Sequence, residues 1–307
     1  MAIKEVEYVW MDGAFVKWNE ANVHILTHAL HYGTGVFEGI RGYAGVNNVY
    51  IFRLREHMRR LHNSAKVYMM DLPYSPDDLC TATVELLKRN NIRETCYIRP
   101  LVYRGFGVIG LNPTKSPVKA AIAAFPFGKY LGTEGVNCCV SSWRRISSSA
   151  LPPEAKACGN YINSVLAKLE AVQNGFDEAI LLDQYGHVSE GSGENLFIVR
   201  DNVIYTPPLA SSILEGITRD SVFKIANDLG YQVVERSITR VELYICDEAF
   251  FSGTAAEITP IVKIDHRVVG DGKIGPVAEK IRTTFFEIVE GKNEQRQRWY
   301  RWLTPVY

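Results

Sequence analysis

Residues 179–205 read Ala-Ile-Leu-Leu-Asp-Gln-Tyr-Gly-His-Val-Ser-Glu-Gly-Ser-Gly-Glu-Asn-Leu-Phe-Ile-Val-Arg-Asp-Asn-Val-Ile-Tyr, and this stretch decides the fold class. Short apolar runs alternate here with turns at Tyr185-Gly186 and Asp201-Asn202. Strands joined by short turns form a meander, whose neighbouring strands pair antiparallel. Because helices and strands also mix elsewhere without strict βαβ alternation, the sequence predicts an α+β fold.

Helices and further strands surround this meander. The spacing of Ile162, Val165, Leu169 and Val172 places them on one face of a helix that ends before Gly175. A second helix is expected to stop at Gly230. In this half of the chain we predict helices over 161–173, 218–229 and 276–290, and strands over 136–142, 232–236 and 248–252.

The first half contains a hairpin signal and a helix signal. Two β-prone runs in 8–17 flank Asp12-Gly13, a dipeptide typical of tight turns. Ser75 and Pro76 favour the start of a helix. The predicted elements are the hairpin 8–17, a helix over 75–90 and strands over 96–103 and 118–125.

These elements suggest two domains. A chain of 307 residues is long enough for two cores. The segment 126–134 carries Pro126, Gly128 and Gly132, as interdomain linkers often do. We therefore expect a small N-terminal α/β domain over 1–125, the linker 126–134, and a larger C-terminal domain over 135–307.

Composition narrows the class of function. Hydrophobic residues make up 47% of the chain, and 34 basic residues balance 34 acidic ones, which argues against a polyanion-binding protein. The first residues lack an apolar core of signal-peptide length, and no apolar run approaches membrane-spanning length. Six cysteines without a C-x-x-C pair fit a reducing compartment. We expect a cytoplasmic protein that binds neither nucleic acid nor membranes.

Three histidines raise a metal alternative. His24, His28 and His31 have spacings that would cluster them on a helix. The glutamate of an H-E-x-x-H zinc motif is missing, and their apolar neighbours favour packing. We therefore expect no metal site and keep a metal-dependent hydrolase as a minor alternative.

The segment Glu154-Ala-Lys156-Ala-Cys-Gly-Asn-Tyr161 surrounds a lysine with small residues. Most lysines are ordinary surface charges. Small neighbours, however, would let a planar ligand approach the amine closely. A buried amine loses its proton more easily than an exposed one, which makes it a nucleophile for aldehydes.

Other segments suggest contacts for a ring and a phosphate. Glu190 and Glu194 lie on either side of two glycines. An ordinary loop with acidic residues at its ends has this pattern. A carboxylate here could also keep the ring nitrogen of a cofactor protonated, which would make that cofactor a better electron sink. The run 214–220 leads into a helix whose first amides could hold a phosphate. The small-residue turn 252–260 offers consecutive amides for a phosphate or carboxylate, although an ordinary strand exit has the same pattern.

Together these segments resemble the class IV aminotransferases, the fold-type IV pyridoxal-phosphate enzymes, and most closely their branched-chain amino acid members. The similarity runs from Val9-Trp-Met-Asp-Gly to Gly275-Pro276. It implies a larger C-terminal domain with a mostly antiparallel, barrel-like sheet. The most similar stretches are 31–41, 55–61, 97–100, 156–161, 190–197, 216–220 and 253–260.

The resemblance also implies roles in binding pyridoxal 5'-phosphate. Lys156 would form an imine with the cofactor and shuttle the substrate proton. Glu190 would pair with the pyridine nitrogen, Tyr161 would bond the ring hydroxyl oxygen, and Leu214 would pack against the ring. The phosphate would be held by Arg60, Ile217, Thr218 and Thr254.

The expected reaction moves an amino group from L-leucine, L-isoleucine or L-valine to 2-oxoglutarate, giving the branched-chain 2-oxo acid and L-glutamate. Tyr97 and the amides of Thr254 and Ala255 would hold the substrate α-carboxylate. Arg99, with Arg41 as the second possibility, would hold the distal carboxylate of 2-oxoglutarate. The apolar side-chain pocket is expected to comprise Tyr32, Phe37, Phe127 and Tyr130.

The resemblance further implies self-association, at least as a homodimer, with tetramers and hexamers left open. The active site would lie at the domain junction, and Tyr32 would enter from a neighbouring subunit. Rival activities within the fold are D-amino acid transamination, amine transamination and 4-amino-4-deoxychorismate lysis. A non-catalytic module is a further alternative, which the presence of Lys156, Glu190 and Tyr161 disfavours.

Overall fold

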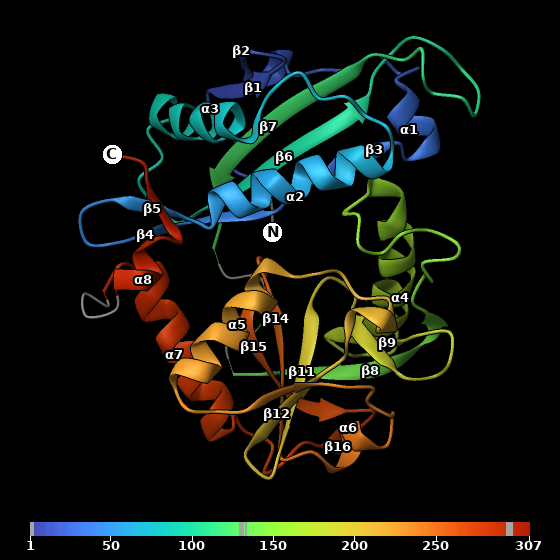
Figure 1. Ribbon diagram of the computed structural model, residues 1–307, viewed down its shortest axis with the longest axis vertical. Helices are drawn as coiled ribbons and strands as arrows, with labels where there is room; N and C mark the ends of the chain where they lie inside the picture. The colour runs from blue at the N-terminus through green and yellow to red at the C-terminus, as the bar shows by residue number, and fades with distance from the viewer. Residues whose placement is uncertain (1–2, 129–131, 133, 293–296) are drawn as a thin grey trace. The chain divides into compact units, whose positions relative to one another are not determined.

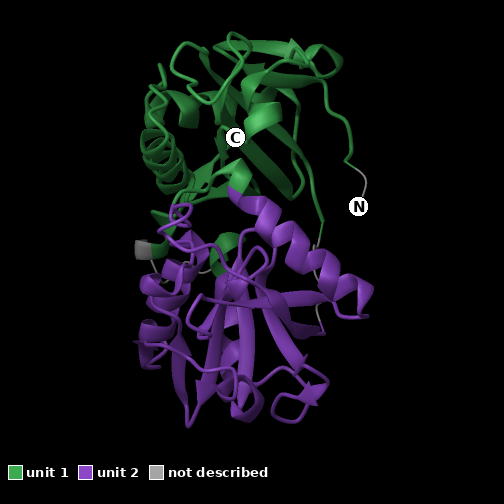
Figure 2. Cartoon of the chain, turned by 90° about the vertical axis from the view of Figure 1, so that its right-hand side faces the viewer, with its two compact units in different colours: residues 1–128, 155–159, 287–307 green, residues 129–154, 160–286 purple. Residues whose placement is uncertain are grey.

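A computed structural model of the chain describes residues 3–128, 132, 134–292 and 297–307 (Figure 1). They form two compact units, which are coloured separately in Figure 2. Unit 1 comprises residues 1–128, 155–159 and 287–307, and unit 2 comprises residues 129–154 and 160–286. The expected Tyr130 lies outside the described residues.

The division differs from the contiguous split expected from the sequence. The first boundary falls at Gly128, inside the segment suggested as a linker. Two later segments nevertheless belong to unit 1. Strand β17 (Leu303–Pro305) pairs with β5 (Val49–Phe52), and Ala157 forms a bridge to Val36. Such long-range pairing leaves no local sequence signal.

Unit 1 is built on an antiparallel sheet with the strand order β17-β5-β4-β6-β7-β1-β2 and with β3 paired to β6. The hairpin prediction is confirmed, since Asp12 and Gly13 have φ values of 47° and 91° between β1 and β2. The remaining bounds are β1 Tyr8–Met11, β2 Ala14–Lys17, β3 Gly35–Phe37, β4 Ile40–Ala44, β6 Cys96–Arg104 and β7 Val118–Pro126.

Two long helices pack on this sheet, as Figure 1 shows. Helix α2 (Leu54–Val67) buries Met58 and Leu61, and α3 (Pro76–Arg89) buries Leu86, in a core shared with the sheet. The predicted start of α3 is confirmed by a capping box, in which the Asp78 N–H donates to Ser75 Oγ at 3.1 Å. The shorter helices of unit 1 are η1 Trp18–Glu20, α1 His28–Tyr32 and α8 Gln297–Tyr300.

Unit 2 contains the second sheet, with the order β10-β9-β8-β15-β14-β11-β12-β13 and with β16 paired to β15. The predicted meander over 179–205 is only partly right. Strand β9 pairs antiparallel with β10, and β11 with β12, but β10 and β11 are not neighbours, and β11 pairs with the distant β14 instead. The α+β prediction is confirmed. The strands are β8 Val136–Arg144, β9 Glu178–Leu182, β10 Val188–Gly191, β11 Asn195–Arg200, β12 Val203–Thr206, β13 Val233–Glu235, β14 Glu248–Gly253, β15 Glu257–Ile264 and β16 Arg267–Val268.

The helices of unit 2 include one with an unexpected orientation. Helix α4 (Tyr161–Gln173) buries Ser164, Ala167 and Ala171, while the apolar face of Ile162, Val165, Leu169 and Val172 is exposed in this chain. Small residues let α4 lie close to β8 and β9. The other helices are η3 Leu209–Ser211, α5 Ile217–Asp228 and α6 Glu242–Ile245, while η2 Cys158–Asn160 and α7 Pro276–Val289 cross the unit boundary.

Candidate active site

The backbone around Lys156 is fixed within unit 1. The Lys156 N–H donates to Ser64 Oγ on α2 at 3.0 Å, and the Phe37 N–H donates to the Lys156 carbonyl at 3.0 Å. Its neighbours Ala155 and Ala157 are buried. The side chain is half-buried, and its Nζ lies 5.1 Å from the centroid of the Phe37 ring. Lys156 is therefore a positioned amine on a rigid support.

Helix α2 also presents Arg60, whose orientation is set by a buried acid. Glu38 is fully buried and accepts from Arg60 Nε at 2.7 Å, from Arg60 Nη2 at 2.9 Å and from His57 Nδ1 at 2.7 Å. Burial alone would raise the pKa of Glu38, but the charges of Arg60 and His57 outweigh it and hold that pKa well below its usual range. Burial lowers the pKa of His57, which the Glu38 charge opposes.

Aromatic and cationic side chains gather beside Lys156 in the same unit. Arg99 Nη2 donates to Tyr97 Oη at 3.0 Å, and its guanidinium lies 4.8 Å from the Phe37 ring centroid. Buried Arg41 donates to the Gly128 carbonyl and lies 5.1 Å from the Phe127 ring centroid. The rings of Tyr97 and Phe127 are 5.1 Å apart. The structure thus brings together five of the expected substrate residues.

The backbone of Gly39 lies so close to the Tyr97 side chain that there is no room for a larger residue. A Cβ at Gly39 would lie 2.1 Å from Tyr97 Oη, a distance that no real side chain tolerates. Gly39 therefore leaves the space that the Tyr97 hydroxyl occupies. Tyr32 behaves differently, because it is exposed on α1 and its described ring contacts are with His28 and His31.

In unit 2, a buried carboxylate is held at several points. Glu190 forms an ion pair with Arg145 Nε at 2.9 Å. It also accepts from Asn195 Nδ2 at 3.0 Å and from the Leu214 N–H at 3.0 Å. The charge of Glu190 is therefore compensated inside the unit, and its position is fixed on β10.

The start of α5 has the form expected of a phosphate seat. Its N-cap is Gly216, which has no side chain to bond the first-turn amides, and Ile217 and Thr218 are buried. A Cβ at Gly216 would lie 1.9 Å from Asn195 Oδ1, so a larger residue there would displace the Asn195 side chain. Since Asn195 also bonds Glu190, the seat and the carboxylate are mechanically linked.

The turn between β14 and β15 carries the other expected anion contacts. Thr254 and Ala255 are half-buried in this turn, and Ser252 just before it is buried with an Oγ that makes no hydrogen bond in the described residues. Glu257, just after the turn, has φ of 55°, a conformation that side chains rarely adopt. An unsatisfied hydroxyl beside a strained turn is compatible with ligand binding here.

A second buried acid, Glu194, lies beneath this turn. Its Oε2 accepts from the Gly193 N–H at 3.1 Å, and its side chain is the nearest group to the Cβ position of Gly253. Burial, together with the charge of Glu178, raises the pKa of Glu194 to about 8. Glu178 is itself paired with Lys168 at 2.6 Å.

Tyr161 begins α4 and is half-buried.

The histidines of the metal alternative have other partners. Only His28 and His31 lie on α1. Both ring nitrogens of His28 are engaged, with Thr34 Oγ1 and the Gly110 carbonyl, each at 2.8 Å. His31 Nε2 bonds the Ile25 carbonyl at 2.9 Å. Across the described ranges, no group of three or more potential metal ligands comes together.

Some residues of these clusters escaped the sequence analysis. Glu38, His57 and Asn195 belong to stretches that were noted, but nothing local indicates what each one touches. Arg145 directly follows β8, and no local pattern indicates that the folded chain brings it to Glu190. None of the described helices is long and apolar enough to span a bilayer.

Comparison with known proteins found a matching family and several similar proteins. Residues 35–264 match the sequence model of the family described as amino-transferase class IV. The branched-chain-amino-acid aminotransferase of Escherichia coli is 46% identical over 97% of this chain and 98% of its own length. That of Thermoproteus uzoniensis, crystallised with norvaline, superposes with a TM-score of 0.95 at 52% identity, covering 98% of this chain and all of its own.

A third similar protein was solved with the cofactor. The branched-chain amino acid aminotransferase of Thermobaculum terrenum, crystallised in its PLP form, has a TM-score of 0.93 at 40% identity, covering 99% of this chain and 99% of its own. All three proteins are thus similar to this chain over nearly its whole length.

Proposed function

The chain belongs to the class IV aminotransferases, and we propose that it is a branched-chain amino acid aminotransferase. It transfers the amino group of L-leucine, L-isoleucine or L-valine to 2-oxoglutarate, giving the branched-chain 2-oxo acid and L-glutamate. The observation that carries this proposal is Lys156, fixed by Ser64 and Phe37 beside an aromatic and cationic group. One methylene changes binding by only about 1–3 kcal/mol, so all three amino acids are accepted.

The cofactor is pyridoxal 5'-phosphate, and both units hold residues that fit it. Unit 1 supplies the Lys156 amine and a cationic phosphate partner, Arg60, pre-oriented by Glu38. Unit 2 supplies the glycine-capped start of α5, with Ile217 and Thr218, and the compensated carboxylate of Glu190. We assign Thr254 to the phosphate as well, Tyr161 to the ring hydroxyl oxygen and Leu214 to the ring face.

When bound, the cofactor supplies an electron sink for the charge left on the substrate carbon after its proton is removed. Glu190 contributes by accepting the N–H of the ring nitrogen, so that this nitrogen keeps its proton. Arg145 keeps Glu190 compensated in turn. The Lys156 Nζ would hold the cofactor through its aldehyde carbon and would take up and return the substrate proton.

The residues of unit 1 around Tyr97 orient the substrate. We assign the α-carboxylate to Tyr97 and the amides of Thr254 and Ala255. Arg99 is exposed and bonds Tyr97, so its guanidinium is available for the distal carboxylate of 2-oxoglutarate, whereas Arg41 is buried against Gly128 and Phe127. We therefore favour Arg99 for that carboxylate. Phe37 and Phe127 provide apolar surface for the branched side chain, and Tyr32 extends it from a partner subunit.

We also propose self-association, at least as a homodimer. The support is exposed apolar surface, notably Ile162, Val165, Leu169 and Val172 on α4 and Ile109 and Leu111 after β6. Sedimentation velocity at micromolar concentration tests this, and a purely monomeric holoenzyme would contradict it. A reducing, cytoplasmic location is supported by the six cysteines, all of which are free thiols.

Borohydride reduction followed by peptide mapping tests the proposal. The pyridoxyl label is expected on the peptide containing Lys156, and turnover is expected with L-leucine and 2-oxoglutarate but not with D-alanine. Lys156→Ala should abolish turnover while the fold persists. A label on another lysine, or no label, would overturn the assignment of the amine. Activity only with D-alanine would overturn the assignment of substrate.

A further inference from the structure

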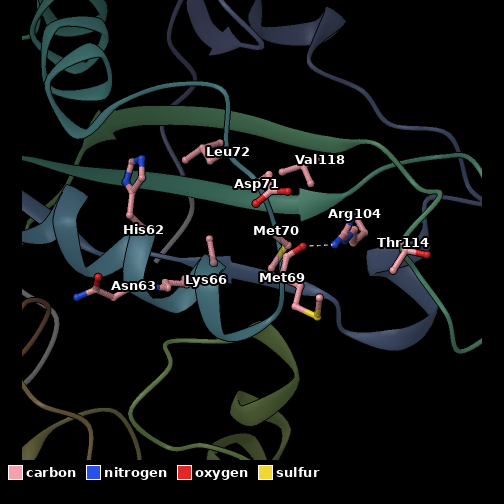
Figure 3. Close-up of a pocket in the computed structure, with 11 residues that line it drawn as sticks. His62, Asn63, Lys66, Met69, Met70, Asp71, Leu72, Arg104, Thr114 and Val118 are labelled. Carbon is pink, nitrogen blue, oxygen red and sulfur yellow. Dashed lines mark hydrogen bonds between the residues drawn. The ribbon is translucent and has the colours of Figure 1, made fainter.

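A cavity of about 670 Å³ lies within unit 1, and its lining includes none of the residues assigned to the reaction (Figure 3). The end of α2, the segment leading to α3 and the facing ends of β6 and β7 surround it. This volume falls within the range of small-molecule sites. The lining mixes one buried cation, Arg104, with apolar side chains that include Met69, Met70, Leu72 and Val118.

Arg104 is the unusual member of this lining. It is only 5% exposed, and its terminal nitrogens donate to two backbone carbonyls, Nη1 to Ser116 at 3.1 Å and Nη2 to Met69 at 2.5 Å. Its Nε–H is buried and makes no hydrogen bond within the described residues. No carboxylate in the described part of the chain lies within 4.0 Å of its nitrogens, the limit for an ion pair. A guanidinium has five N–H donors, so it can still bind an anion.

A buried charge without a counter-charge is unfavourable, because neutral carbonyls replace only part of the hydration that is lost. Most buried charges in proteins are paired for this reason. An anion bound in the cavity would supply the missing charge. Arginine binds carboxylates through a planar edge of paired N–H groups.

The backbone beside Arg104 is held in a rare conformation. Met69 has φ of 53°, a left-handed value that bulky residues seldom adopt. Helix α2 ends here in a Schellman arrangement, in which the Met70 N–H donates to the Ala65 carbonyl at 3.0 Å and the Met69 N–H to the Lys66 carbonyl at 3.1 Å. Glycine is the usual residue at this point. Here the residue is Met69, whose carbonyl accepts a hydrogen bond from Arg104. The flexible, apolar side chain of Met69 also lines the cavity.

The charges of the lining limit the class of ligand. Lys66 adds a second, exposed cation, and Asp71 adds one exposed carboxylate. A doubly charged anion such as phosphate would be repelled by Asp71 and would leave the methionine, leucine and valine surface without a partner. We infer that this cavity binds a small organic anion with one carboxylate and an aliphatic body, its carboxylate on Arg104 and its chain on the methionines.

Methyl NMR of the full-length holoenzyme labelled with [¹³C-methyl]methionine tests this inference. The chain has 5 methionines. Met69 and Met70 line the cavity, whereas Met58 is fully buried in the core and serves as an internal reference. Assignment uses Met69→Leu and Met70→Leu. Octanoate is the probe, and it should shift the two cavity signals saturably while Met58 stays unchanged. Absence of such shifts would overturn the inference.

Charge recognition is tested first on the unmodified protein. Octanamide has the same chain without the charge, and it should bind at least tenfold more weakly than octanoate. Inorganic phosphate alone should also bind at least tenfold more weakly. Equal binding of octanamide would mean that the cavity is merely apolar. Equal binding of phosphate would mean a site for inorganic anions, and either result overturns the proposed ligand class.

Two matched arginine variants complete the design. Arg104→Met should weaken octanoate binding at least tenfold, because it removes the cation and keeps an apolar side chain of similar reach. Arg55→Met makes the same change on the exposed side of α2, where Arg55 pairs with Asp77, and should leave binding unchanged. Equal octanoate affinity in Arg104→Met and the wild type would refute the role of Arg104. If Arg104→Met does not fold, the comparison of octanoate with octanamide decides.

Discussion

Arg60 and Glu38 meet edge to edge, with two parallel hydrogen bonds between the guanidinium and the buried carboxylate. His57 occupies the remaining side of that carboxylate. The arrangement fixes the plane of Arg60, which we proposed as a phosphate partner. The affinity for the cofactor should therefore depend on Glu38, a residue that need not touch the cofactor.

Glu38→Gln should weaken cofactor retention. The amide cannot accept from both nitrogens of Arg60, so the guanidinium loses its fixed plane. A hydrogen bond to a charged group contributes about 1.5–3 kcal/mol, which corresponds to a rise of roughly tenfold or more in the Kd for pyridoxal phosphate. Spectrophotometric titration of the apoenzyme with pyridoxal phosphate measures this Kd. Glu85→Gln, on the exposed side of α3, should bind the cofactor like wild type.

Arg145→Met should destabilise unit 2. It removes the counter-charge of Glu190 and leaves a buried carboxylate with two neutral donors. Breaking a buried pair in this way costs about 3–5 kcal/mol. Urea unfolding of the apoenzyme gives the value. Arg144→Met, the exposed neighbour, should change the free energy of unfolding by less than about 0.5 kcal/mol. Similar losses in both variants would contradict the pairing.

Gly216→Ala should reduce both stability and cofactor affinity. The new methyl would collide with the Asn195 side chain and disturb its bond to Glu190. Overpacking of this kind costs about 1–3 kcal/mol. Gly193→Ala is the matched control, because a Cβ there meets nothing within 4 Å in the described chain. Thermal unfolding of both variants, with and without cofactor, compares them. A Gly216→Ala variant with the Tm of the wild type in both states would argue against the clash with Asn195.

Glu194→Gln should flatten the dependence of stability on pH. The pKa of this carboxyl rises from 4.5 to about 8 on folding, so its proton stabilises the native state at low pH. That contribution is complete below about pH 4.5, is lost as the pH rises towards 8 and is constant beyond. The difference in unfolding free energy between wild type and variant should therefore decrease across this window. A difference that is constant from pH 5 to 8 would contradict the raised pKa.

Arg99→Ala should impair the use of 2-oxoglutarate more than the use of leucine. Only the keto acid carries a distal carboxylate for a guanidinium to bind. The KM for 2-oxoglutarate should rise at least tenfold, whereas that for L-leucine should change little. Steady-state kinetics with each substrate varied in turn gives both values. Equal changes would assign Arg99 to a general supporting role beside Tyr97.

Local patterns in the sequence predicted local structure well. The Asp12-Gly13 hairpin and the Ser75 cap follow from residues adjacent in the chain. The spacing of apolar residues also located α4, but its outward direction was not evident, because alanines at 167 and 171 pack as well as larger residues when two elements lie close together. Periodicity indicates a face without indicating what covers it.

The candidate site was predictable where a single segment carries the chemistry. Lys156, Glu190 and the start of α5 each have a recognisable neighbourhood in the sequence. The groups that hold them were not predictable. Glu38 reaches Arg60 across 22 residues, and Arg145 reaches Glu190 only through the folded sheet. Contacts of that range arise from tertiary packing, which short motifs do not encode.

Gly39 has a consequence for anyone redesigning substrate preference by random mutagenesis. A Cβ at this position would occupy the space of the Tyr97 hydroxyl, so substitutions there should displace Tyr97 and confound any measured change in selectivity. Phe37, two positions earlier, has its ring against Arg99 and Lys156. Diversity is better introduced at Phe37, with codon 39 held constant.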